Sequence, residues 1–162
     1  MEGGSMEQRI CGKCTACCKT HAVYELDKPA GNWCAHCNIG QKCRIYKERP
    51  KSCQEFKCVW LMGNGGSKLC RPDKVEIVAD YRNIPGLGTG IFFFEAVEGA
   101  LNSEFTKKWT RRNLEIGNRV VHVSLVGNSK LYLPDGEENP DMVFRTESGE
   151  EVEIITFVSG KF

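Results

Sequence analysis

All ten cysteines of this 162-residue chain lie between Cys11 and Cys70. A chain of this length can bury a core without metals or crosslinks, and its composition, 41% apolar and 27% charged, is typical of a soluble globular protein. No stretch approaches the roughly 20 apolar residues of a membrane span, and the first thirty residues lack the apolar block of a secretory signal. We therefore expect a cytoplasmic protein whose cysteines are metal ligands rather than disulfide partners.

Charge is divided unevenly between the two halves. Residues 1–70 carry 11 Lys and Arg against 6 Asp and Glu, whereas residues 71–162 carry 11 against 15. A basic half is a feature of nucleic-acid binding. An ion held by several thiolates also carries excess negative charge, which nearby Lys and Arg offset. We favour this second interpretation and expect neither a nucleic-acid nor a membrane partner.

The chain divides into four segments by composition. Residues 1–8 begin Met-Glu-Gly-Gly-Ser-Met, which we interpret as a remnant preceding the fold. Residues 9–62 form a cysteine-rich metal-binding domain with short apolar runs, too few to fold by burial alone. Residues 63–74 contain a Gly-rich run and are interpreted as a linker. Residues 75–162 form a β-rich region of unknown role.

Alternating and continuous apolar runs predict the secondary structure of the second half. A helix is expected from a cap at Asn102 or Ser103 to about Glu115, with Phe105 and Trp109 on its buried side. Strands are expected at Val75–Tyr81, Ile91–Val97, Val120–Val126, Lys130–Leu133, Met142–Arg145 and Val152–Val158. The fold class is therefore α+β: a loop-rich, metal-nucleated cysteine unit with short helices, followed by an antiparallel β-sheet with one helix.

The cysteine spacing is the strongest functional signal. Two residues separate Cys14 from Cys17 and Cys34 from Cys37, a spacing at which a tight turn directs both sulfurs to one ion. Sixteen residues lie between the two pairs, within the range of four-thiolate zinc sites. Iron–sulfur clusters use the same ligands, so the pattern does not identify the metal.

Two histidines lie close to the cysteines in the sequence. His21 and His36 could each replace a thiolate, but a packing or surface role is the more frequent one. Thiol–disulfide chemistry from one Cys-x-x-Cys pair ranks last, because the strand–helix context of such motifs is missing.

The array resembles the bacterial CxxCxxCC cysteine-cluster proteins, the YkgJ-like zinc- or iron-chelating family. The resemblance covers about residues 9–61 and rests on Cys11-Gly-Lys-Cys-Thr-Ala-Cys-Cys18, on Trp33-Cys-Ala-His-Cys37 and on the block from Cys43 to Leu61. It implies chelation of zinc or iron by cysteine. A related cluster in a flagellin lysine methylase is associated with an iron–sulfur centre, but nothing else here matches that enzyme.

The resemblance implies nine ligand candidates: Cys11, Cys14, Cys17, Cys18, Cys34, Cys37, Cys43, Cys53 and Cys58. Cys70 lies outside the motif and is left out. Nine thiols could fill two four-thiolate sites with one to spare, or hold one cluster beside structural thiols.

Three functions remain open from the sequence. We favour a metal-binding protein that holds zinc or an iron–sulfur cluster. The alternatives are an iron–sulfur redox or group-transfer enzyme, and a zinc-stapled module that binds protein or nucleic acid. No catalytic constellation is recognised, so we expect a protein that is not an enzyme.

Overall fold

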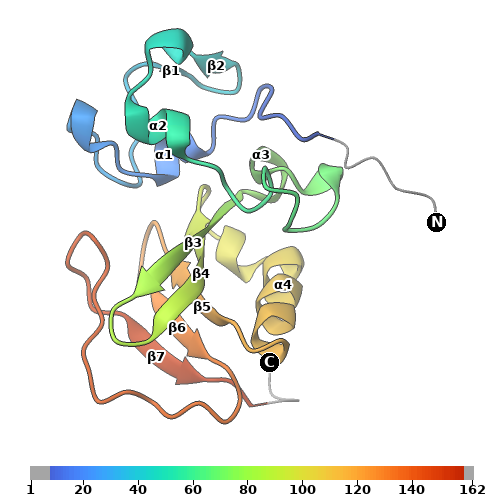
Figure 1. The fold of residues 1–162 in the computed structure, drawn as a ribbon, viewed down its shortest axis with the longest axis vertical. Coiled ribbons are helices and arrows are strands. Elements are labelled where there is room, and N and C mark those ends of the chain that lie inside the picture. Colours follow the sequence, from blue (N-terminus) through green and yellow to red (C-terminus); the bar gives the residue numbers. More distant parts are fainter. Residues whose placement is uncertain (1–7, 159–162) are drawn as a thin grey trace.

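The structure is a computed structural model that describes residues 8–158, with a cysteine-rich unit at one end of a five-stranded sheet (Figure 1). The spatial order of the strands follows the chain. They are β3 (Ile77–Ile84), β4 (Gly88–Glu95), β5 (Arg119–Val123), β6 (Lys130–Leu133) and β7 (Glu153–Thr156). The predicted α+β class is confirmed.

The cysteine-rich unit is built from short elements. In chain order they are α1 (Cys17–Thr20), a 3₁₀ turn η1 (Tyr24–Leu26), strands β1 (Cys37–Asn38) and β2 (Lys42–Cys43), a 3₁₀ turn η2 (Tyr46–Glu48) and α2 (Lys51–Glu55). Pro50 separates η2 from α2, because the residue before a proline, Arg49, is extended. Seven of the eight residues interpreted as a remnant, 1–7, lie outside the described residues.

Residues 63–74, predicted as a linker, contain regular structure in their second half. They include the 3₁₀ turn η3 (Lys68–Cys70) and lead into α3 (Pro72–Val75), which begins with proline at its first position. This segment therefore joins the two parts through ordered backbone.

The longest helix, α4 (Glu104–Glu115), begins where its capping residue predicts. The Ser103 hydroxyl accepts a hydrogen bond from the Thr106 amide at 3.2 Å, which satisfies one of the free N–H groups of the first turn. Trp109 stacks on Phe93 of β4 with the ring centroids 4.4 Å apart. The helix thus covers one face of the sheet (Figure 1).

The predicted antiparallel sheet is wrong in one respect, because the sheet is mixed. Strand β4 pairs with β5 in parallel, and β6 pairs with β7 in parallel, while the other two pairings are antiparallel. Parallel neighbours need a crossover connection, which α4 supplies for the first pair and residues 134–152 supply for the second. The strand predicted at Met142–Arg145 is absent: Arg145 only forms an isolated bridge with Glu151.

Strand β4 separates two apolar cores. Phe93 faces α4 in a core with Ile77, whereas Phe92 and Phe94 lie in the opposite core on the side of the cysteine-rich unit. Burial on both faces explains the continuous apolar run in this strand.

A segment of the cysteine-rich unit belongs to both cores. The Val59 amide donates to the Ala79 carbonyl of β3 at 2.9 Å, and the Val59 side chain lies in the helix-side core. Its neighbours Cys58 and Trp60 lie in the opposite core. The segment therefore alternates between the two faces as a strand would.

His122 of β5 predicts an acid-sensitive fold. Its imidazole is buried and lies 2.8 Å from the Thr110 hydroxyl, and burial, together with nearby Lys130, lowers its pKa to about 3. Because the unfolded histidine protonates near pH 6.5, the neutral buried ring contributes stability that is lost as the pH falls below that value. We expect urea unfolding to show that His122→Gln removes about 2 kcal/mol of the stability difference between pH 7 and pH 4.5. Equal pH dependence in the two proteins would contradict this.

Candidate metal centre

Five of the predicted ligands gather around helix α1. Cys17 and Cys18 open the helix, and the Cys18 carbonyl accepts a hydrogen bond from the Cys34 amide at 3.0 Å. This bond brings the second Cys-x-x-Cys pair to the first part of the motif. Helix α2 adds Cys53, whose thiol lies within electrostatic range of Cys18 and Cys34.

Of the two expected Cys-x-x-Cys pairs, Cys34 and Cys37 close a turn, whereas the other turn joins Cys11 to Cys14 rather than Cys14 to Cys17. The Cys37 amide donates to the Cys34 carbonyl at 3.0 Å, and the Cys14 amide donates to the Cys11 carbonyl at 2.9 Å. A turn of this kind places its two side chains on the same side. Cys43 lies opposite Cys37 in the two-stranded sheet of β1 and β2.

Cys18 is the centre of the first group, which we call the α1 thiol group: Cys17, Cys18, Cys34, Cys37 and Cys53. The Cys18 thiol lies beside the thiols of Cys17 and Cys37. The contact with Cys17, followed by burial, raises the pKa of Cys18, and burial followed by Cys18 raises that of Cys37 to about 11. In the absence of a cation the Cys18 and Cys37 thiols are therefore protonated, and a bound metal would have to displace their protons.

A buried lysine lies beside the α1 thiol group. The Lys28 ammonium donates hydrogen bonds to the carbonyl oxygens of Lys19, at 2.9 Å, and of His21. Burial lowers the pKa of Lys28, while Cys18, Cys34, Cys17 and Cys53 oppose that change. The positive charge thus faces the position where thiolates would form.

The remaining cysteines of the first motif form a second group. Cys11 and Cys14 lie near the buried Cys58 and beside the Arg71–Asp73 ion pair, in which Nε and Oδ1 are 2.5 Å apart. Burial raises the pKa of Cys14 to about 11 and also raises that of Cys58. We call Cys11, Cys14 and Cys58 the Arg71 thiol group.

The nine predicted ligands do not form a closed coordination shell. Within residues 8–158, no three side chains among His, Cys, Asp and Glu meet at a common metal-binding position. The donor sets nevertheless suit thiolate-loving metals, because each group contains at least three free thiols and the first has an adjacent cation. The fold therefore places eight of the predicted ligands in two groups and the ninth, Cys43, opposite Cys37, without directing their sulfurs to a common point.

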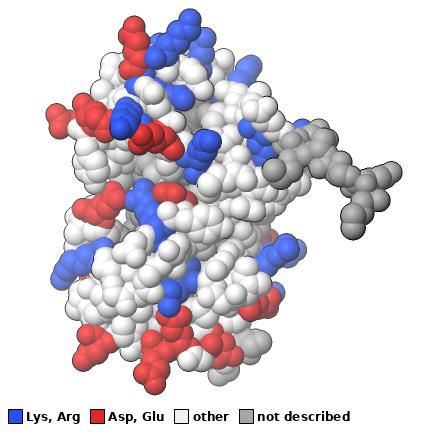
Figure 2. All heavy atoms as spheres, in the orientation of Figure 1, with Lys and Arg blue, Asp and Glu red and all other residues white. Residues whose placement is uncertain are grey.

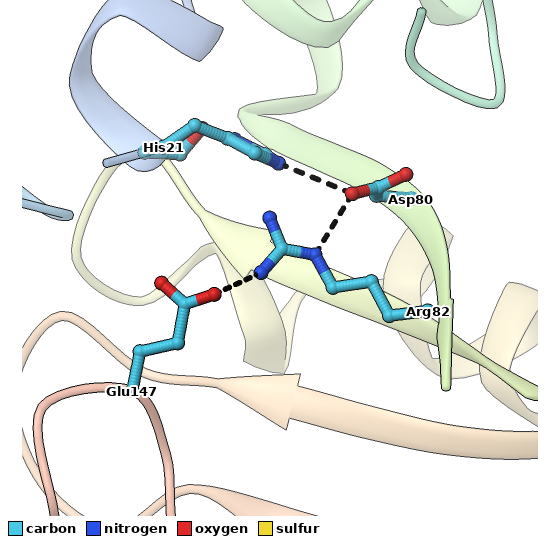
Figure 3. Close-up of polar contacts among 5 residues, drawn as sticks. His21, Asp80, Arg82 and Glu147 are labelled. Carbon is cyan, nitrogen blue, oxygen red and sulfur yellow. Dashed lines mark hydrogen bonds and ion pairs between the residues drawn. The ribbon is translucent and has the colours of Figure 1, made fainter. Parts of the chain in front are cut away.

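The ring of His21 is packed in the core, which is the role that the sequence analysis favoured over metal binding. His21 is buried between Phe56 and Phe94, with ring centroids 4.4 Å from each, and its Nε2 lies 3.6 Å from Asp80 Oδ2 (Figure 3). His36 is half-buried, and its carbonyl accepts from the Arg44 amide at 2.8 Å.

Sequence reasoning missed several residues of this region. Lys28 and Asp73 are not distinguishable from surface charges in the sequence, because their positions depend on contacts far along the chain. Cys70 was left out for lying beyond the motif, but it directly precedes Arg71, whose guanidinium lies beside Cys11 and Cys14. In the sequence, the only sign that Cys70 belongs to this region is that it is the last of the ten clustered cysteines.

The visible surface does not carry a continuous basic patch. Figure 2 shows Lys and Arg mixed with Asp and Glu, with more basic groups toward the cysteine-rich end and more acidic groups toward the sheet end. Among the described residues, every helix is too short or too polar to cross a bilayer.

Comparison with family models, with curated proteins and with solved structures found no match. The resemblance to the CxxCxxCC family therefore stays a prediction from the motif alone.

The buried ammonium of Lys28 predicts a charge requirement for metal binding. Lys28→Met should weaken zinc binding about tenfold, because the thiolates lose a nearby compensating charge. Competition with a chromophoric chelator measures the affinity. Lys42→Met, on the exposed strand β2, is the matched control and should bind zinc as the wild type does. A Lys28→Met protein with unchanged affinity would contradict the prediction.

Proposed function

We propose that this protein binds a thiophilic metal, as zinc or as an iron–sulfur cluster, through the cysteines of residues 9–61. The observation that carries the proposal is the α1 thiol group, which gathers five thiols from three segments: helix α1, the Cys34–Cys37 turn and helix α2. Four of them, Cys17, Cys18, Cys34 and Cys53, lie within electrostatic range of buried Lys28. The Lys28 ammonium bonds the carbonyls of Lys19 and His21 at the end of α1, and from this position its charge would also offset thiolates in the α1 thiol group.

The grouping of the thiols favours two sites. The α1 thiol group, with Cys43 opposite Cys37, would hold one ion or cluster. The Arg71 thiol group would hold another, with Asp73, which lies beside Cys14, available to complete it. Its three cysteines and one further donor match the ligand count of a structural zinc site.

The metal-binding role agrees with the family resemblance and with a reducing compartment. All ten cysteines are free, as expected for a cytoplasmic protein. We propose a cytoplasmic metal-binding protein rather than a secreted disulfide-stabilised one.

Metal content and colour, measured on protein purified without oxygen, test the proposal directly. We expect either zinc in a colourless sample or iron with acid-labile sulfide and visible absorption. Absence of any bound metal after anaerobic purification and reconstitution would overturn the proposal.

Paired serine substitutions test the division into two groups. Cys34→Ser with Cys37→Ser, and Cys11→Ser with Cys14→Ser, should each remove about half of the bound metal, because each pair serves one site. Cys70→Ser, outside the motif, is the control and should retain the metal. Full metal content in either double variant would contradict the assignment.

Metal removal should loosen only one part of the molecule. On treatment with a chelator, amides of residues 9–57 should lose protection from hydrogen exchange, because this unit has few apolar side chains of its own. Amides of β4 and β5 should stay protected, since both faces of these strands are packed. Uniform protection before and after chelation would show that the unit folds without metal.

A further inference from the structure

A cleft of about 730 Å³ lies between the cysteine-rich unit, the sheet and the hairpin of residues 144–150. Its floor is apolar and consists of alternate side chains of two neighbouring strands: Phe92, Phe94, Val121 and Val123. Cavities of this size that combine an apolar floor with a few charged groups are typical of small-molecule sites. None of its lining residues belongs to the predicted metal ligands.

One cationic group, Arg82 of β3, is held in a fixed position at the cleft. Its Nε donates to Asp80 Oδ2 at 2.9 Å, and its guanidinium lies over the Phe94 ring, 4.7 Å from the centroid. On its other side, Asp80 Oδ2 lies 3.6 Å from His21 Nε2 (Figure 3). Arg82 is thus fixed along one edge and one face, with its remaining N–H groups directed away from Asp80.

The outward edge of Arg82 is occupied by a carboxylate from the hairpin. Its Nη1 donates to Glu147 Oε1 at 2.6 Å, across 65 residues of sequence. The Glu147 side chain is half exposed and comes from a turn closed by the Gly149 amide and the Thr146 carbonyl. Because Glu147 lies on an exposed turn, another carboxylate can compete for the same position on Arg82.

We propose that this cleft binds a small carboxylate with an apolar body, and that Glu147 occupies the ligand's carboxylate position when the cleft is empty. The ligand carboxylate would pair with Arg82, and its apolar body would lie along Phe92 and the half-buried Val123, which line the cleft. Pairing of a fixed guanidinium with a carboxylate is directional and strong in a partly desolvated site.

The other acidic groups of the cleft do not prevent this. Asp80 is engaged by Arg82 Nε, so its charge is balanced on the inner side. Glu95 accepts hydrogen bonds from the Gly99 and Leu125 amides, at 2.8 and 2.9 Å, and is buried. Glu150 also lines the cleft, but it is exposed, so solvent screens its charge. Glu147 is therefore the carboxylate that must be displaced.

Three probes of one shape test the charge of the ligand: hydrocinnamate, phenylpropanol and phenylpropylamine. Isothermal titration of the full-length protein as purified, at constant ionic strength, should detect hydrocinnamate and show at least about tenfold weaker binding of the alcohol and the amine. Amide shifts in the NMR spectrum should change at Phe92–Phe94 and in residues 144–150.

Two variants test the mechanism in opposite directions. Glu147→Gln should bind hydrocinnamate about three- to tenfold more tightly, because the internal competitor loses its charge. Arg82→Gln should weaken binding about tenfold or more. Glu150→Gln, which removes a charge from the same hairpin without a bond to Arg82, is the matched control and should change the affinity by less than about twofold.

The gain of affinity keeps the test informative even if Arg82→Gln folds poorly. Preference for the amine or the alcohol, unchanged affinity in Glu147→Gln, or no binding of any probe to either protein would overturn the proposal. Shift changes confined to residues outside the cleft would overturn it as well. The proposal does not depend on the metal, so loss of metal binding and loss of carboxylate binding are separate results.

Discussion

The packing of residues 58–60 against β3 is the interaction on which the arrangement of both halves depends. The Val59 amide bonds to Ala79, and its side chain enters the helix-side core, while Cys58 and Trp60 enter the core on the other face. A segment anchored on both faces of a sheet cannot rotate away from it without exposing apolar surface in two places. The cysteine-rich unit, which has few buried apolar residues of its own, therefore takes its position from the sheet.

This anchoring explains how two groups of thiols can coexist in a small unit. Cys58 belongs both to the anchored segment and to the Arg71 thiol group, so that group lies at the boundary with the sheet. The α1 thiol group is held instead by local turns and by the hydrogen bond between Cys34 and Cys18. Metal binding would stabilise the region around the α1 thiol group, whereas burial against the sheet stabilises the region around Cys58.

The sequence predicted those features that depend on neighbouring residues. Ser103 and the spacing of Phe105 and Trp109 located α4, and the spacing of Cys34 and Cys37 predicted a turn that is formed. The predicted pair of Cys14 with Cys17 is instead divided between the two thiol groups. Strand order and direction were not predictable in the same way. Alternation of apolar residues indicates a strand, but it does not determine which strand pairs with it or whether the pairing is parallel. The grouping of the thiols around Lys28 depends on long-range contacts too, and the pairing of Arg82 with Glu147 joins residues 65 positions apart.

The two proposed sites share a structural support. Helix α1 begins with Cys17 and Cys18 and is followed by His21, whose ring is packed between Phe56 and Phe94. The same Phe94 ring supports the Arg82 guanidinium, and the Asp80 carboxylate lies between His21 and Arg82. A shift of α1 would therefore change the packing beneath Arg82, because rigid, close-packed side chains transmit small displacements. The cysteine-rich unit and the cleft are therefore coupled through the packing around Phe94 and Asp80, although no residue is assigned to both proposed sites.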